Sequence, residues 1–255
     1  MNIIACYKVV PDEQDIVIRP DRTLSLDKAE WKIGQYDLQA VEAGMQLAEV
    51  TGGQLSALSA GAGQLANTKL KKSILARGPD ALFQIIDESL AMADSYHTAS
   101  VLAAAVNKIG NIDLVLCGEG SSDLYAQQVG AQLGEILAMA TVNAVSRLTV
   151  EGNRLIAERT LEEEIEVVEI PLPAVVTVTT DINLPRIPGM KEILAAGKKP
   201  VTQWCLADIG LEFSTQSTEV VSTLAPLQVE RKQIILEGES EEIVNKLFNS
   251  LRRVL

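Results

Sequence analysis

Short apolar runs alternate with segments of helical periodicity through the first half of the chain. Apolar runs of strand length, each followed by a loop with Gly, Pro or acidic residues, fall at residues 2–10, 54–60, 81–86 and 112–117. Apolar side chains recurring at intervals of three and four predict helices at residues 37–51, 65–76, 99–109 and 124–136. This alternation predicts an α/β fold with an open, mostly parallel sheet and helices on both faces.

The hydrophobic pattern changes before the first helix and again after residue 141. Residues 16–18 and 24–26 alternate around a Pro-Asp-Arg turn and predict a hairpin before the first helix. Four β-rich segments predict antiparallel edge strands at residues 142–150, 154–160, 165–170 and 174–179. Glu151-Gly152-Asn153 is the expected tight turn between the first two of these segments.

The sequence beyond Asp181 has too few apolar residues for a core of its own. It is irregular and interrupted by prolines, with one expected amphipathic helix near residues 241–251. An apolar segment without a core packs either on its parent domain or on a partner subunit. We therefore expect an α/β domain over residues 1–184 and a loop with a C-terminal arm over residues 185–255.

Charge and composition narrow the classes of function. The formal charge of −12 and pI near 4.6 give a surface field that repels nucleic-acid phosphates and anionic lipids. The sequence shows no membrane-spanning stretch and no secretory signal, so we expect neither membrane insertion nor export. Three widely spaced cysteines without a C-x-x-C motif favour a reducing compartment, and we expect the cytoplasm.

A single histidine limits the possible catalytic chemistry. His97 has no second histidine with which to form a metal pair, so we expect no metal site and no His-based triad. His97 itself is expected to be a surface or helix-capping side chain. Cys6 and Cys117 end apolar runs and are expected to be small buried residues.

Three loops qualify as ligand sites because an open, Rossmann-like parallel sheet binds its ligands beyond the carboxyl ends of its strands. These loops are residues 6–8, 60–63 and 118–123. The third has the strongest signal, since it carries glycines and serines and leads into the helix expected from Leu124. Its acids disfavour a triphosphate, and a simple tight turn explains the same residues. Neither G-x-G-x-x-G nor G-x-x-x-x-G-K-[ST] occurs.

A long spaced motif lies between Ala157 and Thr177. It consists of a basic residue, an acidic triplet, a further acid, and then Pro followed by an apolar pair ending in Thr. With this motif, the chain resembles the β subunit of electron-transfer flavoproteins, of the bacterial type that includes the Fix-like proteins, over essentially its whole length. Residues 5–8, 35–42 and 118–130 match as well.

The resemblance implies a nucleotide site formed by these matching stretches. In this family the site holds AMP or, in electron-bifurcating members, a second FAD. By position the contacts fall on Cys6, Gly34, Gln35, Tyr36, Asp37, Ala60, Gly118, Glu119, Gly120, Ser121, Ser122, Asp123, Leu124, Tyr125, Ala126, Gln127, Gln128 and Val129. Leu124 and Tyr125 replace a glycine and an acid that bifurcating members commonly carry, so AMP is preferred and FAD is the alternative.

The resemblance also implies a non-catalytic electron carrier subunit. Its heterodimeric partner, the α subunit, would hold the redox FAD and be embraced by the C-terminal segment. The pair would exchange electrons with a flavin-dependent, acyl-CoA-type dehydrogenase, recognised by a loop whose apolar anchor corresponds to Met190.

Two other classes of protein remain as alternatives. A stand-alone nucleotide-binding sensor module would need no α subunit, but it would not explain the motif or the long tail. An ATP pyrophosphatase-type enzyme should carry Ser-Gly-Gly-x-Asp-Ser after the first strand, where this chain has Tyr7-Lys8-Val9-Val10-Pro11.

Overall fold

The computed structural model describes residues 1–152, 154–212, 218–227 and 233–252. The chain divides into two compact units. One comprises Met1–Val17 and Ser25–Ser222, and the other comprises Ile18–Leu24 and Thr223–Leu255. No helix among the described residues is both long enough and apolar enough to cross a bilayer.

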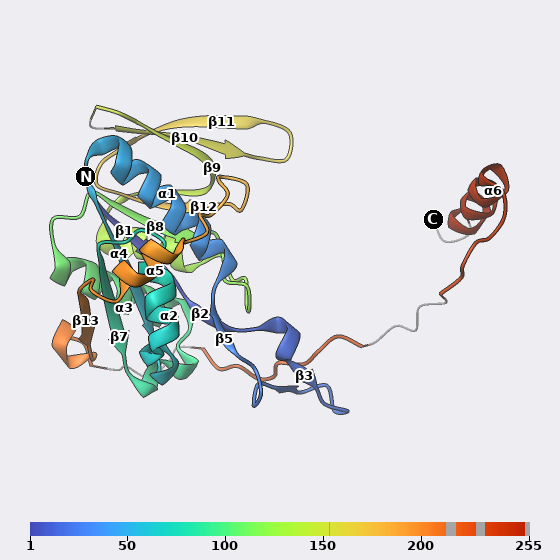
Figure 1. The fold of residues 1–255 in the computed structure, drawn as a ribbon, viewed down its shortest axis with the longest axis horizontal. Helices are drawn as coiled ribbons and strands as arrows, with labels where there is room; N and C mark the ends of the chain where they lie inside the picture. The colour runs from blue at the N-terminus through green and yellow to red at the C-terminus, as the bar shows by residue number, and fades with distance from the viewer. Residues whose placement is uncertain (153, 213–217, 228–232, 253–255) are drawn as a thin grey trace. The chain divides into compact units, whose positions relative to one another are not determined.

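A nine-stranded sheet forms the centre of the larger unit in the part of the chain that the structure describes (Figure 1). In spatial order its strands are β11 (Ile165–Pro171), β10 (Arg154–Thr160), β9 (Ala140–Glu151), β12 (Ala174–Val178), β8 (Leu114–Gly118), β1 (Asn2–Cys6), β6 (Gln54–Gly61), β7 (Ala81–Ile86) and β13 (Val201–Trp204). Neighbouring strands from β9 to β13 are parallel, whereas β10 is antiparallel to β9 and β11. The predicted α/β fold class is confirmed.

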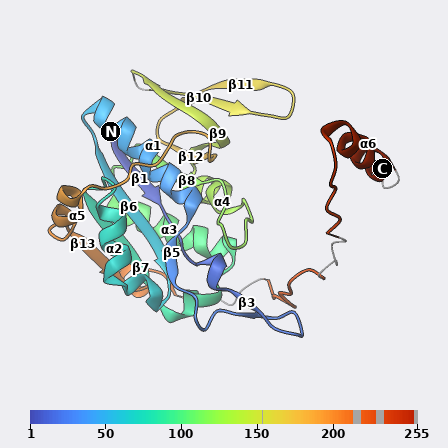
Figure 2. The same ribbon diagram turned by 45° about the vertical axis from the view of Figure 1, so that its right-hand side comes forward.

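Helices cover both faces of this sheet, as Figures 1 and 2 show. The helices of the larger unit are α1 (Gln35–Thr51), α2 (Thr68–Leu75), α3 (Ser95–Ile109), α4 (Val129–Leu137) and α5 (Met190–Ala196). Successive residues of β1 point to opposite faces, so Ile3 packs with α1 and α2 while Ile4 packs with α3 and α4. Burial on both faces explains why the central strands are continuous apolar runs.

Short elements connect these helices and strands. The 3₁₀ turns are η1 (Glu13–Asp15), η2 (Gly63–Ala66), η3 (Glu88–Met92) and η4 (Ala207–Ile209). Two small sheets pair β2 (Val9–Pro11) with β5 (Trp31–Ile33) and β3 (Val17–Ile18) with β4 (Leu24–Ser25). The second of these is the hairpin predicted before the first helix.

The first helix approaches the sheet closely because its inner face is lined with small residues. Ala40, Ala43, Gly44 and Ala48 are all buried on α1. A Cβ added to Gly44 would lie 2.7 Å from Cδ1 of Leu55 on β6, closer than carbon atoms approach without displacement. Small side chains therefore set the spacing between α1 and the strands beneath it.

Three helix starts differ from the predictions. The helix after β8 begins at Val129, and residues 124–128 belong to the preceding loop. The helix predicted from residue 37 begins two residues earlier, at Gln35, so that Gly34 is its N-cap and Asp37 lies within its first turn. The helix predicted over residues 65–76 is also shorter, since Gly63–Ala66 forms a 3₁₀ turn before α2.

The later part of the larger unit corrects two more predictions. Ala174–Val178 is an interior parallel strand between β8 and β9, not an antiparallel edge strand. The chain after residue 185 is less irregular than its prolines suggested, because it forms α5 and the parallel edge strand β13. The acidic run at residues 162–164 lies in the turn between β10 and β11, as expected, whereas the turn predicted at Asn153 lies outside the described residues.

The smaller unit contains α6 (Ser240–Leu251), which agrees with the amphipathic helix expected near residues 241–251. No residue of α6 is buried, and its side chains Val244, Leu247, Phe248 and Leu251 are all exposed. An amphipathic helix is stable when its apolar face is covered. This face therefore lacks apolar cover among the described residues.

Candidate functional site

The centre of the sheet contains a topological switch point. From β1 the chain crosses to β6 on one side and later returns through β8 on the other side. Loops diverge at such a point and leave a crevice beyond the carboxyl ends of the strands, where open α/β sheets bind their ligands. Cys6 and Gly118 mark the two strand ends at this position.

Asp37 connects the elements around these two strand ends. One of its carboxylate oxygens, Oδ2, accepts the backbone N–H of Lys8 at 2.7 Å, and the carboxylate also accepts the N–H of Gly118. Burial raises the pKa of Asp37 from 3.8 to about 7, although the two N–H donors favour the charged form. A buried carboxyl group thus links the end of β1, the first turn of α1 and the end of β8.

Gly118 is required where α1 meets the end of β8. A Cβ at this position would lie 2.8 Å from Oδ1 of Asp37 and 2.8 Å from the Cβ of Tyr36. The Tyr36 backbone carbonyl carbon is also 2.8 Å away, so a larger residue would displace the first turn of α1. This glycine therefore lets two elements of the fold approach each other closely.

Lys8 joins the loop after β8 to the end of β1, and the sequence analysis missed it as a site residue. Its Nζ lies 2.7 and 2.9 Å from the two carboxylate oxygens of Asp123. Burial opposes ionisation of Asp123, yet hydrogen bonds from Lys8 and Ser121 outweigh it and lower the pKa of the carboxyl. The available signal was the matching stretch at residues 5–8, whose last residue supplies the cation that the loop lacks.

Two tyrosines form the aromatic part of the cluster. The rings of Tyr36 on α1 and Tyr125 in the loop have centroids 5.2 Å apart, and Tyr125 also packs over Gly120. Tyr125 and Gln127 hold left-handed backbone conformations, with φ of 46° and 57°. Such conformations cost energy in non-glycine residues and concentrate at ligand-binding loops.

Several backbone amides of this loop are already used within the chain. Glu119 N–H donates to Val178 O at 3.0 Å, Tyr125 N–H to Ser121 O at 2.9 Å and Leu124 N–H to Asp123 Oδ1 at 2.9 Å. These three groups are not available to a phosphate in this conformation. The remaining carboxylates, hydroxyls and exposed tyrosine ring suit a nucleoside, because carboxylates accept from ribose hydroxyls and aromatic rings stack on purines.

The structure brings most of the predicted residues together. Cys6, Gly34–Asp37 and the loop from Gly118 to Tyr125 surround the same two strand ends. Ala60 lies near the carboxyl end of β6, at the same edge of the sheet. The remaining loop positions, Ala126, Gln127 and Gln128, are exposed.

The far end of the loop lies next to a different helix. Gln128 Oε1 accepts from Ser95 Oγ at 2.6 Å, and Val129 begins α4. The loop therefore runs from the end of β8 to the start of α4 and contacts the start of α3 on the way.

The two thiols beside the site are buried, as predicted. The side chain of Cys117 and burial hold the pKa of Cys6 well above 9.0, so its thiol is protonated at neutral pH. The prediction for His97 was half right. It lies in the first turn of α3 with Nδ1 2.8 Å from Oδ1 of the N-cap Asp94, but it is buried rather than on the surface.

A second region of interest is the segment leading into α5. Arg186 forms an ion pair with the buried Glu42 of α1, with Nε 2.7 Å from Oε2. Asn183 also donates to the backbone oxygen of Gln39 at 3.0 Å. Met190, the first residue of α5, is 73% exposed. The segment is thus fixed to α1 at one end and presents an apolar side chain to solvent at the other.

Among the described residues, no group of three or more His, Cys, Asp or Glu side chains could hold a metal ion. A family model described as the electron transfer flavoprotein domain matches residues 23–209, which is well over half of the chain. The matched region includes α1, the loop after β8, the β10–β11 hairpin and Met190. It leaves out Cys6, Lys8 and α6.

Proposed function

Because the chain belongs to the electron transfer flavoprotein family, we propose that it is the β subunit of a heterodimeric electron transfer flavoprotein of the bacterial Fix-like type. Proteins of this family carry electrons and bind flavin. The subunit performs no bond-making chemistry itself, and it positions a nucleotide and docks its partners. The spaced motif between Ala157 and Thr177, which spans the β10–β11 hairpin, supports this choice of subunit.

The single observation that carries the nucleotide site is the Lys8–Asp37–Asp123 cluster at the switch point of the sheet. We assign AMP to this cluster, with the residues from Cys6 to Val129 named above as its contacts. Tyr125 fills the space above Gly120 and contacts Tyr36, which leaves less room for an isoalloxazine ring. A second FAD is therefore the less favoured occupant.

The proposed α subunit carries most of the FAD-binding surface and covers apolar residues of this chain. On the edge strand β11, Ile165 and Val167 are each 65% exposed on one face. The apolar face of α6 is uncovered in the same way among the described residues. Contiguous exposed apolar surface of this kind marks protein interfaces. On this proposal, residues 1–184 bind the nucleotide and residues 185–255 recognise partners.

The electron-transfer partner in this proposal is a flavin-dependent, acyl-CoA-type dehydrogenase. Met190 suits an anchor because its unbranched thioether adapts to different pockets. It is accompanied by Leu184, Ile187 and Leu194, which are 90%, 91% and 70% exposed. The proposal includes a cytoplasmic location, supported by the free thiols of Cys6, Cys117 and Cys205.

The proposal is tested by electron exchange in the complex with the α subunit. Purified acyl-CoA dehydrogenases, each with its substrate, are mixed anaerobically with the complex, and reduction of the flavin is followed by absorbance. We expect at least one dehydrogenase to reduce the flavin. Met190→Ala should slow that exchange about tenfold, the loss expected for an interface anchor, and leave the flavin content unchanged. If no dehydrogenase reduces the complex, the electron-carrier proposal is wrong.

A further inference from the structure

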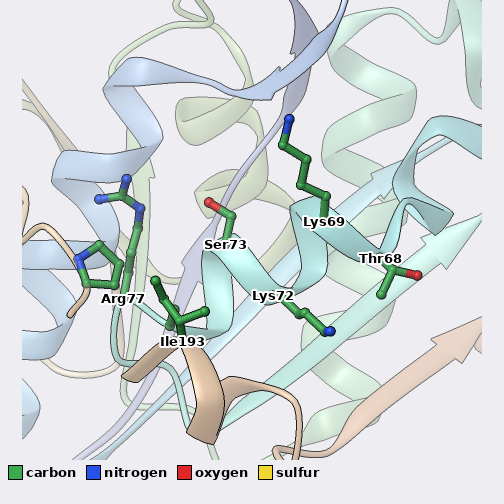
Figure 3. Close-up of a pocket in the computed structure, with 8 residues that line it drawn as sticks. Thr68, Lys69, Lys72, Ser73, Arg77 and Ile193 are labelled. Atoms are coloured by element: carbon green, nitrogen blue, oxygen red, sulfur yellow. The ribbon is translucent and has the colours of Figure 1, made fainter. Parts of the chain in front are cut away.

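A cavity of about 580 Å³ lies between α2 and the segment that contains Met190 (Figure 3). Its lining comprises basic, hydroxyl and apolar side chains from both sides, namely Thr68, Lys69, Lys72, Ser73, Ala76, Arg77, Pro188 and Ile193. None of these residues belongs to the nucleotide cluster at the switch point.

The cavity has the form of a groove along one side of α2. Residues 68, 72 and 76, and likewise 69, 73 and 77, repeat at intervals of four and therefore share one face of the helix and the turn after it. In Figure 3 the labelled side chains of these two rows follow the helix axis, and Ile193 of α5 lies alongside. A site whose lining follows a helix in this way suits an extended or helical chain segment.

The two walls of the groove are fixed to each other. Arg77 donates from Nη1 to the backbone oxygen of Arg186 at 2.7 Å. Lys199, which follows α5, donates from Nζ to the oxygens of Leu75 and Gly78 at 2.9 Å each. The first contact lies before Met190 in the sequence and the second lies after it. The groove is therefore preformed beside the exposed methionine.

The groove carries positive charge on a strongly acidic chain. Lys69, Lys72 and Arg77 line it, whereas the chain as a whole has a formal charge of −12. Lys69 meets Glu30 at 3.5 Å, and both side chains are so exposed that this pair is weak. Among the described residues, no carboxylate forms an ion pair with Lys72 or Arg77, and the buried Nε of Arg77 has no acceptor. Glu42 acts on Arg77 only from beyond ion-pair distance, so an anionic occupant would supply a direct counter-charge.

We propose that this groove binds an acidic segment of the redox partner, with Asp or Glu side chains facing Lys72 and Arg77 and apolar side chains facing Pro188 and Ile193. This inference rests on the proposed function and adds a second contact beside Met190. Complementary charge at the edge of an interface accelerates association and fixes the orientation of the partners. The groove therefore selects dehydrogenases that carry an acidic surface next to the pocket for Met190.

The test compares two charge reversals on the same helix. Lys72→Glu places a like charge opposite the acidic segment, while Lys71→Glu makes the same change at a position outside the groove lining. Each variant is prepared as the full complex with the α subunit. The second-order rate of flavin reduction by purified acyl-CoA dehydrogenases is measured from low to high ionic strength.

At low ionic strength we expect Lys72→Glu to slow the reaction about tenfold and Lys71→Glu to change it less than about twofold. The difference should shrink toward high salt because screening weakens interactions between exposed charges. Equal rates for the two variants at low salt would overturn the inference while leaving the proposed function intact. If no dehydrogenase reduces the wild-type complex, the proposed function fails, and the inference fails with it.

Two further measurements keep the test independent of folding and of small anions. Flavin content and the unfolding temperature should be the same in both variants as in the wild type, and Lys72→Ala should show a smaller loss of rate in the same direction. Titration with inorganic phosphate should give no saturable heat below about millimolar concentration. Tight phosphate binding that is lost in Lys72→Glu would identify a small anion as the occupant and contradict the inference.

Discussion

Replacing Arg186 tests how the segment that carries Met190 is held against α1. The guanidinium donates from Nε and Nη2 to the two oxygens of Glu42, at 2.7 and 3.1 Å, and from Nη1 to Glu49 at 2.9 Å. The Glu42 side chain is only 7% exposed, whereas that of Arg186 is 34% exposed. Arg186→Met keeps the aliphatic stem and leaves the buried carboxylate without its counter-charge.

The magnitude follows from this geometry. Removing one partner of a buried ion pair costs about 3–5 kcal/mol. The partial exposure of Arg186 reduces this cost, and Gln46 still donates to Glu42 at 3.0 Å. We therefore expect a loss of about 2–3 kcal/mol in the free energy of unfolding, which lowers the Tm by about 5–10 °C in a chain of this size. The loosened segment must then be ordered on docking, so electron exchange should slow about fivefold.

The assay follows thermal unfolding of the complex and anaerobic flavin reduction by the dehydrogenase. Arg154→Met is the matched control, because the ion pair of Arg154 with Glu169 has both side chains more than half exposed. This control should lower stability by about 0.5 kcal/mol or less. Adding Glu42→Leu to Arg186→Met removes the stranded carboxylate and should recover most of the stability. Electron exchange with the dehydrogenase should stay slow in that double variant.

Two results would refute this reasoning. If Arg186→Met and Arg154→Met lower the Tm equally, the Glu42–Arg186 ion pair stabilises the protein no more than an exposed ion pair does. If the double variant restores exchange together with stability, Arg186 acts on the whole fold and not on the orientation of the Met190 segment.

The remaining predictions concern the nucleotide cluster. Asp37→Asn removes a carboxyl whose pKa is about 7 when folded and 3.8 ordinarily. The folded state binds this proton more tightly than the unfolded state, so the free energy of unfolding of the wild type falls as pH rises from 4 to 7. Measured by denaturant unfolding, the difference in free energy of unfolding between wild type and variant should change by about 4 kcal/mol over that range. A difference that does not depend on pH would contradict the burial argument. Gly118→Ala should lower the free energy of unfolding by about 2–3 kcal/mol because it displaces Asp37 and Tyr36, and it should lower the AMP content of the purified complex. Full AMP occupancy would show that the structure relieves the close contact elsewhere. Lys8→Met should weaken AMP binding about tenfold in calorimetry and change stability by less than about 1 kcal/mol; an unaltered Kd would remove the Lys8–Asp123 pair from the site.

The sequence was sufficient to predict the parallel core of the fold. Its strands are buried on both faces, so apolar runs and helical periodicity report them directly. The match over residues 23–209 confirms the resemblance to the electron transfer flavoprotein family. Ala174–Val178 was predicted with the wrong strand pairing, because a fully buried strand has the same run of apolar residues whether its neighbours are parallel or antiparallel.

The errors near the site have a common physical cause. Residues 124–128 combine helix-compatible side chains with left-handed backbone at Tyr125 and Gln127, and periodicity does not report backbone strain. Lys8 was missed because its partner Asp123 is 115 residues away in the sequence. The stretch with α5 and β13 was expected to be irregular because prolines at its ends obscured two short elements held by tertiary contacts.

The most direct test of the central claim is to count the nucleotides released when the chain, co-purified with its candidate α subunit, is denatured. The account predicts a stable pair that releases one FAD and one AMP, with the AMP lost in Lys8→Met. Two FAD per pair would contradict the assignment of AMP to the switch-point cluster. A chain that forms no pair and releases no flavin would contradict the β-subunit proposal. That result would favour a stand-alone nucleotide-binding module or an ATP pyrophosphatase-type enzyme instead.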